Sequence, residues 1–288
     1  MKYILEYIPL RVAVFALSLL PRSIALKVGK AAGSLACLLM GKRLGLAISN
    51  IQAALPGTSE EKAREIVKGC WQNLGMSAAD VASLPSVDKE NFFTIVDAKG
   101  VEHVKASQAK GKGILMIGGH YGPWEFTSHV FAFSQIPMAA VARRIKNPYV
   151  DALLNHYRTL HGNTLIQARN AVRNTIRDLK EGKGVGILID HRVAEGGLVV
   201  PFLGRPAHTT TMPAILALRL RAPVHFIRAW RQGGKIKLEI TPEMDLSGVP
   251  NSPEGIEKAT RMMNGVFEGW IREKPENWLW IHNRWKTG

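Results

Sequence analysis

The sequence predicts an α/β fold, with a mixed sheet flanked by helices and a helical N-terminal segment in front of it. Two buried apolar runs, Gly113–Ile117 (GILMI) and Gly184–Ile189 (GVGILI), have the length of strands and alternate with helical patterns. A pair of antiparallel strands, Val224–Trp230 and Lys235–Ile240, is indicated by the two glycines that join them. Residues 1–84, by contrast, carry only helical patterns.

The other elements follow in chain order. Thr58 and Glu61 have the spacing of a helix capping box, and we expect their helix to run to about Leu84, where Pro85 ends it. Beyond residue 90, short strands are expected at Phe92–Val96, Met138–Ala142 and Thr164–Ile166. Helices are expected at Val101–Lys110, Pro123–Gln135, Asn147–His161, Ala168–Glu181, Thr211–Leu220 and Pro253–Glu273. We therefore divide the chain into N-terminal helices 1–41 and a domain 42–288, made of a helical lead-in 42–89 and an α/β core 90–288.

Composition narrows the class of protein. The chain has 288 residues, 46% of them apolar, which is enough for a large core and too apolar for a disordered protein. Cys37 and Cys70 lie in helical patterns and form neither a disulfide framework nor a zinc-type pair, so they fit a reducing compartment. The net charge of +15 attracts anionic membranes, phosphorylated lipids or acidic proteins. Because the basic residues are dispersed and no nucleic-acid-binding motif is present, we expect no nucleic-acid partner.

The N-terminal segment 1–41 carries two apolar stretches. Val12–Leu20 is shorter than the ~20 residues of an ordinary membrane span, and Ala31–Met40 ends at Gly41-Lys42-Arg43. No small-residue cleavage pattern follows the first stretch, so a signal peptide is not expected. We expect these helices to contact a membrane, either as a hairpin in the interface or with the first helix spanning it. Packing of both helices on the core is the alternative.

A candidate site follows the first buried strand, in the segment Gly118-Gly119-His120-Tyr121-Gly122-Pro123-Trp124-Glu125. Ligands bind at the carboxyl ends of strands in α/β sheets, and glycines permit a close approach of the backbone. Pro123 suits the first position of a helix, which makes Glu125 its third residue, near the positive end of the helix. If Glu125 folds back onto His120, it fixes the imidazole tautomer and leaves the other ring nitrogen as a base.

Simpler interpretations of the same residues stay open. Glu125 fits a helix cap and His120 a hydrogen-bonded loop histidine. A metal site is disfavoured because one histidine and one glutamate are too few ligands and His129 lies further along the helix. No cofactor is expected.

The ordered set of motifs resembles the bacterial lipid A biosynthesis acyltransferase family over nearly the whole chain. His120 and Glu125 form the His-x4-Glu motif of that family. The other matching parts are the apolar N-terminus and the segments Arg144–Tyr149, Gly184–Asp190, Pro201–Ala207 and Trp278–Lys286. The chain departs from the family pattern at His191, where the family usually has Gln, and over His208–Met212.

The resemblance implies a glycerolipid-acyltransferase-like fold and an acyl transfer at the cytoplasmic face of the inner membrane. The donor is acyl carrier protein or acyl-CoA, and the acceptor is a hydroxyl of a phosphorylated glycolipid. Since a thioester is already activated and no Gly-x-Ser-x-Gly elbow is present, we expect direct attack with His120 as general base. The rival interpretations are another glycolipid or phospholipid acceptor, and a non-catalytic, basic membrane-binding protein of the same fold.

Supporting roles are assigned to four further residues. The resemblance places a functional arginine at Arg158, for which a solvated helix position is the alternative. Asp190 ends a buried strand, where it either orients a site arginine or histidine or caps the next turn. Backbone N–H groups around Gly122 and Trp124 are candidate donors to the oxyanion of the reaction.

Overall fold

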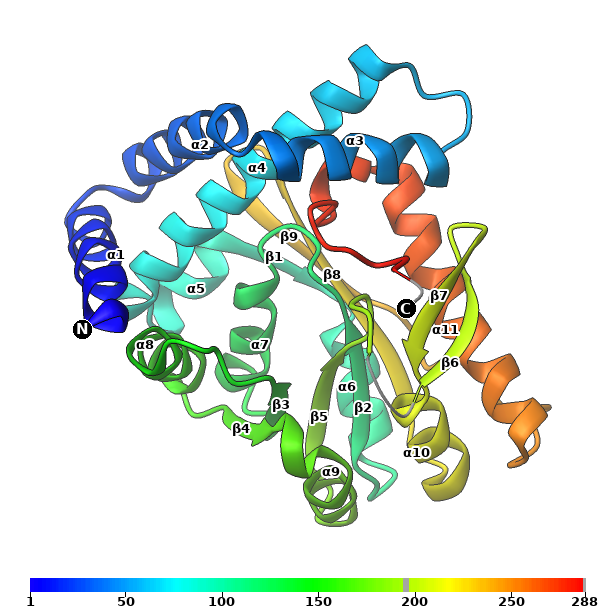
Figure 1. Cartoon of the computed structure of the whole chain (residues 1–288). Helices are drawn as coiled ribbons and strands as arrows, with labels where there is room; N and C mark the ends of the chain where they lie inside the picture. Colours follow the sequence, from blue (N-terminus) through cyan, green and yellow to red (C-terminus); the bar gives the residue numbers. More distant parts are fainter. Residues whose placement is uncertain (194–196, 287–288) are drawn as a thin grey trace.

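A computed structural model describes residues 1–193 and 197–286, so residues 194–196 and 287–288 of the predicted α/β core lie outside the described residues (Figure 1). Its centre is a seven-stranded sheet in which neighbouring strands are parallel except for the antiparallel pair β8–β9. The strand order is β1 (Val96–Lys99), β9 (Lys235–Ile240), β8 (Val224–Gln232), β2 (Ile114–Gly118), β5 (Gly184–Leu188), β3 (Met138–Ala142) and β4 (Thr164–Gln167). The predicted mixed α/β sheet is therefore confirmed.

Helices precede the sheet and connect its strands. The N-terminal ones are α1 (Lys2–Ser18), α2 (Arg22–Leu39), α3 (Gly41–Ala54) and α4 (Glu60–Ser83), followed by the 3-10 turn Leu84–Ser86. Within the core lie α5 (Lys89–Ile95), α6 (Val101–Gln108), α7 (Trp124–Phe133), α8 (Pro148–Thr159), α9 (Ala171–Lys180), α10 (Met212–Leu220) and α11 (Pro253–Glu273), with 3-10 turns at Ala168–Asn170 and Pro275–Asn277.

The sheet is buried on both faces, as its continuous apolar strands predict. Alternate side chains of β2 enter two different hydrophobic clusters, Leu115 and Ile117 one, Ile114 and Met116 the other. The first cluster contains residues of α3, α4, α10 and α11, and the second contains residues of α5, α6, α7 and α8. β2 is thus held rigidly in the middle of the sheet, and its carboxyl end is a well-fixed place for a site.

The helix α2 packs closely along α4. A side chain at Gly29 would lie 2.5 Å from the carbonyl oxygen of Gly75, and one at Gly33 would lie 2.2 Å from that of Trp71. Only glycine permits these two backbones to approach so closely. α1 is different, because none of its residues is buried. It lies at the edge of the molecule (Figure 1).

Within the described residues, no single helix combines the length and apolar character that a span requires, and α2 with α3 reach it only jointly, across a 93° bend.

Two local predictions are wrong. The apolar run that starts at Phe92 is not a strand but part of α5, because Asp88 and Asn91 form a reciprocal capping box at its start; the strand begins only at Val96. The cap of α4 is Ser59, whose hydroxyl accepts the N–H of Lys62, whereas the Thr58 hydroxyl donates to the carbonyl of Leu55.

The hairpin of β6 (Gly197–Phe202) and β7 (Arg205–Thr210) was not predicted. Its two-residue turn consists of Leu203 and Gly204, both with positive φ, of 50° and 75°. Leucine rarely occupies this conformation, so the turn has a weak sequence signal. The hairpin packs beside α11, away from the main sheet (Figure 1).

Candidate active site

The ends of two central strands bring His120 and Asp190 together. β2 and β5 are parallel neighbours with Gly118 opposite Leu188, so the residues that follow them emerge at the same edge of the sheet. The backbone N–H of His120 donates to Oδ2 of Asp190 over 2.9 Å, and Nδ1 of His120 lies 3.0 Å from Oδ1. Asp190 is fully buried, while 20% of the His120 side chain is exposed.

Glycines and the C-terminal segment fix the loop after β2. A side chain at Gly119 would lie 2.3 Å from the ring of Phe267 and 3.1 Å from the Asp190 carboxyl carbon. Gly122 has a φ of +56° and lies against the carbonyl of Ala229, so it too requires glycine. Tyr121 forms an antiparallel bridge with Trp278, whose indole N–H donates to Oδ2 of Asp190 over 2.9 Å. Residues far apart in the sequence therefore share one rigid site.

The charge state of Asp190 determines the tautomer of His120. Burial opposes ionisation of Asp190, but the charge and hydrogen bonds of His120 outweigh it and lower the pKa of the carboxyl below its usual range. An ionised carboxylate only accepts hydrogen bonds, so Nδ1 of His120 carries the proton. Nε2 then has a free lone pair and can act as a base.

Glu125 has a different partner from the one predicted. Arg158 donates to both carboxylate oxygens, Nε to Oε2 over 2.9 Å and Nη2 to Oε1 over 2.6 Å, and the Trp124 indole donates to Oε1 over 3.2 Å. Burial raises the pKa of Glu125, but the guanidinium outweighs it and holds the pKa below its ordinary value. The expectation that Glu125 orients His120 is therefore corrected: Asp190 occupies that position, and Glu125 is held by the planar fork of Arg158.

The start of α7 also differs in detail from the prediction. Pro123 is the N-cap, so Glu125 is the second residue of the helix. The Gly122 N–H donates to the carbonyl of Asn277 over 2.7 Å and is not available to a substrate. Within the described residues, the N–H groups of Trp124 and Glu125 in the first turn have no hydrogen-bond partner. The Trp124 ring lies 5.3 Å from that of His120, edge to face.

Two histidines that the sequence analysis did not assign to the site form a stack with His120, in which His191 lies between His120 and His282. The rings of His120 and His191 are 3.8 Å apart and nearly parallel, at 6°, and His191 and His282 are 3.9 Å apart at 14°. His191 directly follows Asp190, which is a signal that it lies near the site. The position of His282, in the C-terminal segment, has no comparable signal in the sequence.

A metal centre does not fit this arrangement. Ligand atoms of His120, Asp190 and His191 lie within 4.8 Å of one another. A metal ion binds near the plane of an imidazole ring, and two parallel rings 3.8 Å apart cannot both direct a nitrogen at one ion. The Nδ1 atom of His120 is, in addition, hydrogen-bonded to Asp190.

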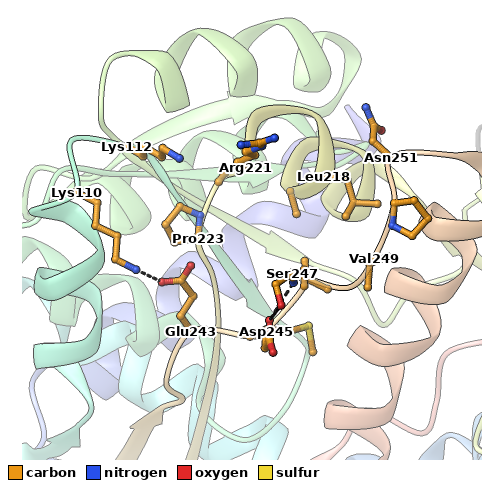
Figure 2. Close-up of a pocket in the computed structure, with 15 residues that line it drawn as sticks. Lys110, Lys112, Leu218, Arg221, Pro223, Glu243, Asp245, Ser247, Val249 and Asn251 are labelled. Carbon is orange, nitrogen blue, oxygen red and sulfur yellow. Dashed lines mark hydrogen bonds and ion pairs between the residues drawn. The ribbon is translucent and has the colours of Figure 1, made fainter.

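A large cavity lies away from this site. It has a volume of about 880 Å³ and lies at the opposite edge of the sheet, where Lys112 precedes β2 and Pro223 precedes β8 (Figure 2). Lys110 pairs there with Glu243, and Ser247 donates to Asp245. The cleft beside His120 and Trp124 is only about 10 Å³, room for about one water. We assign the site from the histidine–carboxylate geometry, because the large cavity contains no comparable pair.

The fold and the site together define an α/β enzyme with a buried histidine–aspartate pair at the carboxyl edge of its sheet. Among known families, the one described as bacterial lipid A biosynthesis acyltransferase matches residues 2–287. The chain belongs to this family and has its acyltransferase activity, with an acyl donor and a lipid A acceptor implied.

Individual relatives agree with this assignment. The chain is 26% identical to the lipid A biosynthesis palmitoleoyltransferase of Escherichia coli (strain K12), over 93% of this chain and 87% of the relative. It is 27% identical to the lipid A biosynthesis lauroyltransferase of the same organism, with the same coverage. A phosphatidylinositol mannoside acyltransferase of Mycolicibacterium smegmatis is 20% identical over 70% of this chain and 66% of its own length.

Proposed function

We propose that the protein transfers a fatty acyl chain from an acyl carrier protein thioester to a hydroxyl of a lipid A precursor, with His120 as general base. The observation that carries this proposal is the His120–Asp190 pair, in which Asp190 accepts from Nδ1 and the neutral imidazole has its free lone pair on the accessible Nε2. The proposed place of action is the cytoplasmic face of the inner membrane.

The reaction needs no covalent enzyme intermediate. The acceptor hydroxyl oxygen attacks the thioester carbon while Nε2 of His120 takes the hydroxyl proton. The tetrahedral intermediate then collapses, the carbon–sulfur bond breaks, and His120 returns the proton to the leaving thiolate. Asp190 stabilises the imidazolium between these two steps. The products are an ester and the free thiol of the carrier.

Cysteine chemistry is not needed in this scheme. Cys37 and Cys70 are both buried, and burial raises the pKa of Cys70 to about 12, so it stays a thiol at neutral pH. Cys70 lines the small cleft beside His120 without acting as a nucleophile.

The first turn of α7 supplies oxyanion stabilisation in this proposal. The unpartnered N–H groups of Trp124 and Glu125 lie at the positive end of a helix, directly after the loop that holds His120. The Glu125–Arg158 pair connects this turn to α8 and fixes it against the neighbouring helix. Glu125 and Arg158 are thus positioning residues for the reaction.

Surface charge and apolar exposure support the proposed partners. A net charge of +15 favours both an acidic carrier protein and a phosphorylated glycolipid. On α1, Leu5, Val12 and Phe15 are between 56% and 65% exposed, which favours contact with a lipid surface.

Turnover of purified protein tests the function. Acyl carrier protein carrying a labelled acyl chain is mixed with a lipid A precursor in detergent, and the acylated lipid is quantified by mass spectrometry. Transfer is expected from the native protein and loss of roughly 10²–10⁴-fold from a folded His120→Ala variant. Near-native turnover by that variant would refute the base assignment, and turnover only with acyl-CoA would replace the proposed donor.

A second acceptor class is supported by the similarity to a mannoside acyltransferase. The same assay with a mannosylated phospholipid in place of the lipid A precursor decides between the two glycolipids. If neither acceptor is acylated and no thioester is consumed, the protein is a membrane-binding member of the fold rather than an enzyme.

Vesicle flotation tests the membrane contact. Val12→Ser and Phe15→Ser together remove apolar area from a helix without buried residues, so the fold should persist while vesicle binding weakens. A matched control replaces Lys62 and Glu65, an exposed ion pair on α4, by glutamine, which leaves the net charge unchanged. Unchanged flotation of the double serine variant would disprove a lipid-contacting role of α1.

A further inference from the structure

The three stacked imidazoles of His120, His191 and His282 form a unit whose role goes beyond the His120–Asp190 pair. His191 is the middle ring, 3.8 Å from His120 on one side and 3.9 Å from His282 on the other. We propose that His191, backed by His282, is a positioning residue that holds the His120 ring from its face and confines the positive charge of the reaction to His120. The proposal rests on the proposed function, in which His120 is the base.

The stack complements the other contacts of His120. Asp190 fixes the ring within its own plane through Nδ1, and the edge-to-face Trp124 ring lies 5.3 Å away. A hydrogen bond to one nitrogen still allows the ring to tilt about that bond. The parallel ring of His191, 3.8 Å away, restricts this tilt. It therefore also restricts the direction in which Nε2 of His120 points toward a substrate hydroxyl.

Hydrogen bonding assigns the state of His282. Its Nε2 accepts the backbone N–H of Arg192 over 3.1 Å, so this nitrogen carries no proton. His282 is therefore a neutral imidazole with its proton on Nδ1. Its own backbone is held as well, because the Asn50 side chain donates to the carbonyl of His282 over 3.2 Å. The outer ring of the stack is thus a fixed and uncharged support.

The surrounding charges keep the middle ring neutral too. His191 faces His120, Asp190, His282 and Arg284. Arg284 is fully buried and its hydrogen bonds go to neutral groups, the carbonyl of His208 and the Thr209 hydroxyl. Asp190 faces this cluster, and Arg284 already lies within its field. Glu125 also lies within the field of His120, but its charge is paired with Arg158. A second imidazolium beside His120 would be a further buried cation with no anion of its own.

Titration directions agree with this geometry. Burial, together with the neighbouring His120, lowers the pKa of His191 to about 3. Burial lowers the pKa of His282 to about 4, and Arg284 and Arg43 act in the same direction while Asp190 opposes them. When His120 takes a proton, its cation therefore stacks on a neutral π face, which is the favourable arrangement of a cation and an aromatic ring.

Two substitutions of His191 separate stacking from mere space filling. His191→Phe keeps a flat ring and cannot titrate, whereas His191→Gln removes the ring. We expect kcat to fall by about 3- to 10-fold in His191→Gln with KM unchanged, and by no more than about 2-fold in His191→Phe. His156→Gln, on the exposed side of α8, is the matched control and should retain native kcat.

Nuclear magnetic resonance of the native protein with labelled histidine provides a readout that does not depend on turnover. The ring-nitrogen shifts of His191 and His282 should be those of neutral imidazoles from about pH 8 down to about pH 5. Protonation of His191 above about pH 5, or a native kcat in His191→Gln, would overturn the proposal. If His120→Ala is active, the base assignment fails; if it is inactive while His191→Gln is fully active, only the stack fails.

Discussion

Two buried carboxylates lie beside the reaction centre, and they have different partners. Asp190 accepts hydrogen bonds from Nδ1 and the backbone N–H of His120 and from the Trp278 indole N–H. Glu125 accepts hydrogen bonds from Nε and Nη2 of Arg158. Each carboxyl has a pKa below its ordinary value, one through an imidazole and the other through a guanidinium. The first carboxylate can change the reactivity of its partner, while the second can only hold its partner in place, since arginine keeps its proton.

This difference predicts the largest effect for Asp190→Asn. The amide keeps the size of the side chain but presents an N–H as well as a carbonyl oxygen. If the amide N–H faces His120, Nδ1 becomes the acceptor and Nε2 carries the proton, which is the wrong tautomer for a base. We expect kcat to fall by roughly 10²–10⁴-fold.

The measurement is acyl transfer by Asp190→Asn beside its thermal midpoint. The variant should remain folded, since the amide can still accept the Trp278 indole N–H. A kcat close to that of the native protein would remove the distinction between the two carboxylates and return Glu125 to consideration as the partner of His120.

Glu125→Gln should act mainly on stability. It leaves the Arg158 guanidinium without its anion in a site where only 22% of the arginine side chain is exposed. Breaking such a pair from one side costs about 3–5 kcal/mol, and replacement of both partners costs less. The double variant Glu125→Gln with Arg158→Met should therefore recover part of the lost stability.

Urea unfolding and turnover of these variants sharpen the comparison. The single variant should lose stability clearly and activity by about 10-fold, through displacement of the first turn of α7. If Glu125→Gln instead remains fully stable and loses activity as strongly as Asp190→Asn, Glu125 takes part in the chemistry directly.

The two carboxylates also show how much of the site could be predicted from the sequence. His120 and Asp190 each follow a buried apolar run, so the rule that sites lie at the carboxyl ends of strands selects both. That β2 and β5 are neighbours is a property of the sheet order, which local patterns do not contain. The partner of His120 was therefore sought nearby in the chain, at Glu125. His282 and Trp278 reach the site only through the path of the C-terminal segment.

Predictions from local sequence patterns failed where side-chain hydrogen bonds started a different element. Phe92 and Phe93 favour a strand by composition, but the Asp88–Asn91 capping box starts a helix before them. Long elements were predicted well, α11 to the residue, because its apolar positions recur over many turns.

As the pH falls, the stability contributed by the neutral histidines beside Asp190 should be lost before the stability contributed by Glu125. The pKa values of His191 and His282, about 3 and about 4, lie below the 6.5 of a free imidazole. Stability from these neutral rings is complete above about pH 6.5 and is lost as the pH falls from there toward the folded pKa, by about 1.4 kcal/mol per pH unit per ring. Glu125 also has a lowered pKa, so its contribution is complete above about pH 4.5 and is lost only below that value.

Unfolding free energies of the native protein and His191→Phe between pH 7 and pH 5 measure this order. Phenylalanine cannot titrate, so the pH slope of the variant should be smaller by about one proton in the acid part of this range. Other buried histidines, such as His129 with a pKa lowered by burial to about 4, contribute equally to both proteins. Parallel curves would show that His191 is not a buried neutral ring.

The smallest effect is expected for Arg158→Lys. This substitution keeps the positive charge beside Glu125 and removes only the pair of parallel hydrogen bonds that the guanidinium donates. An ammonium group cannot donate to both carboxylate oxygens in the planar geometry that Nε and Nη2 of Arg158 adopt. It still neutralises Glu125, so we expect a loss of only about 1 kcal/mol in stability and a fall of only a few-fold in kcat. Arg158→Met, which removes the charge as well, should be clearly worse in both measurements. If Arg158→Lys instead abolishes transfer while the protein remains folded, the guanidinium contacts the reacting groups, and the division between a reactive and a positioning carboxylate has to be redrawn.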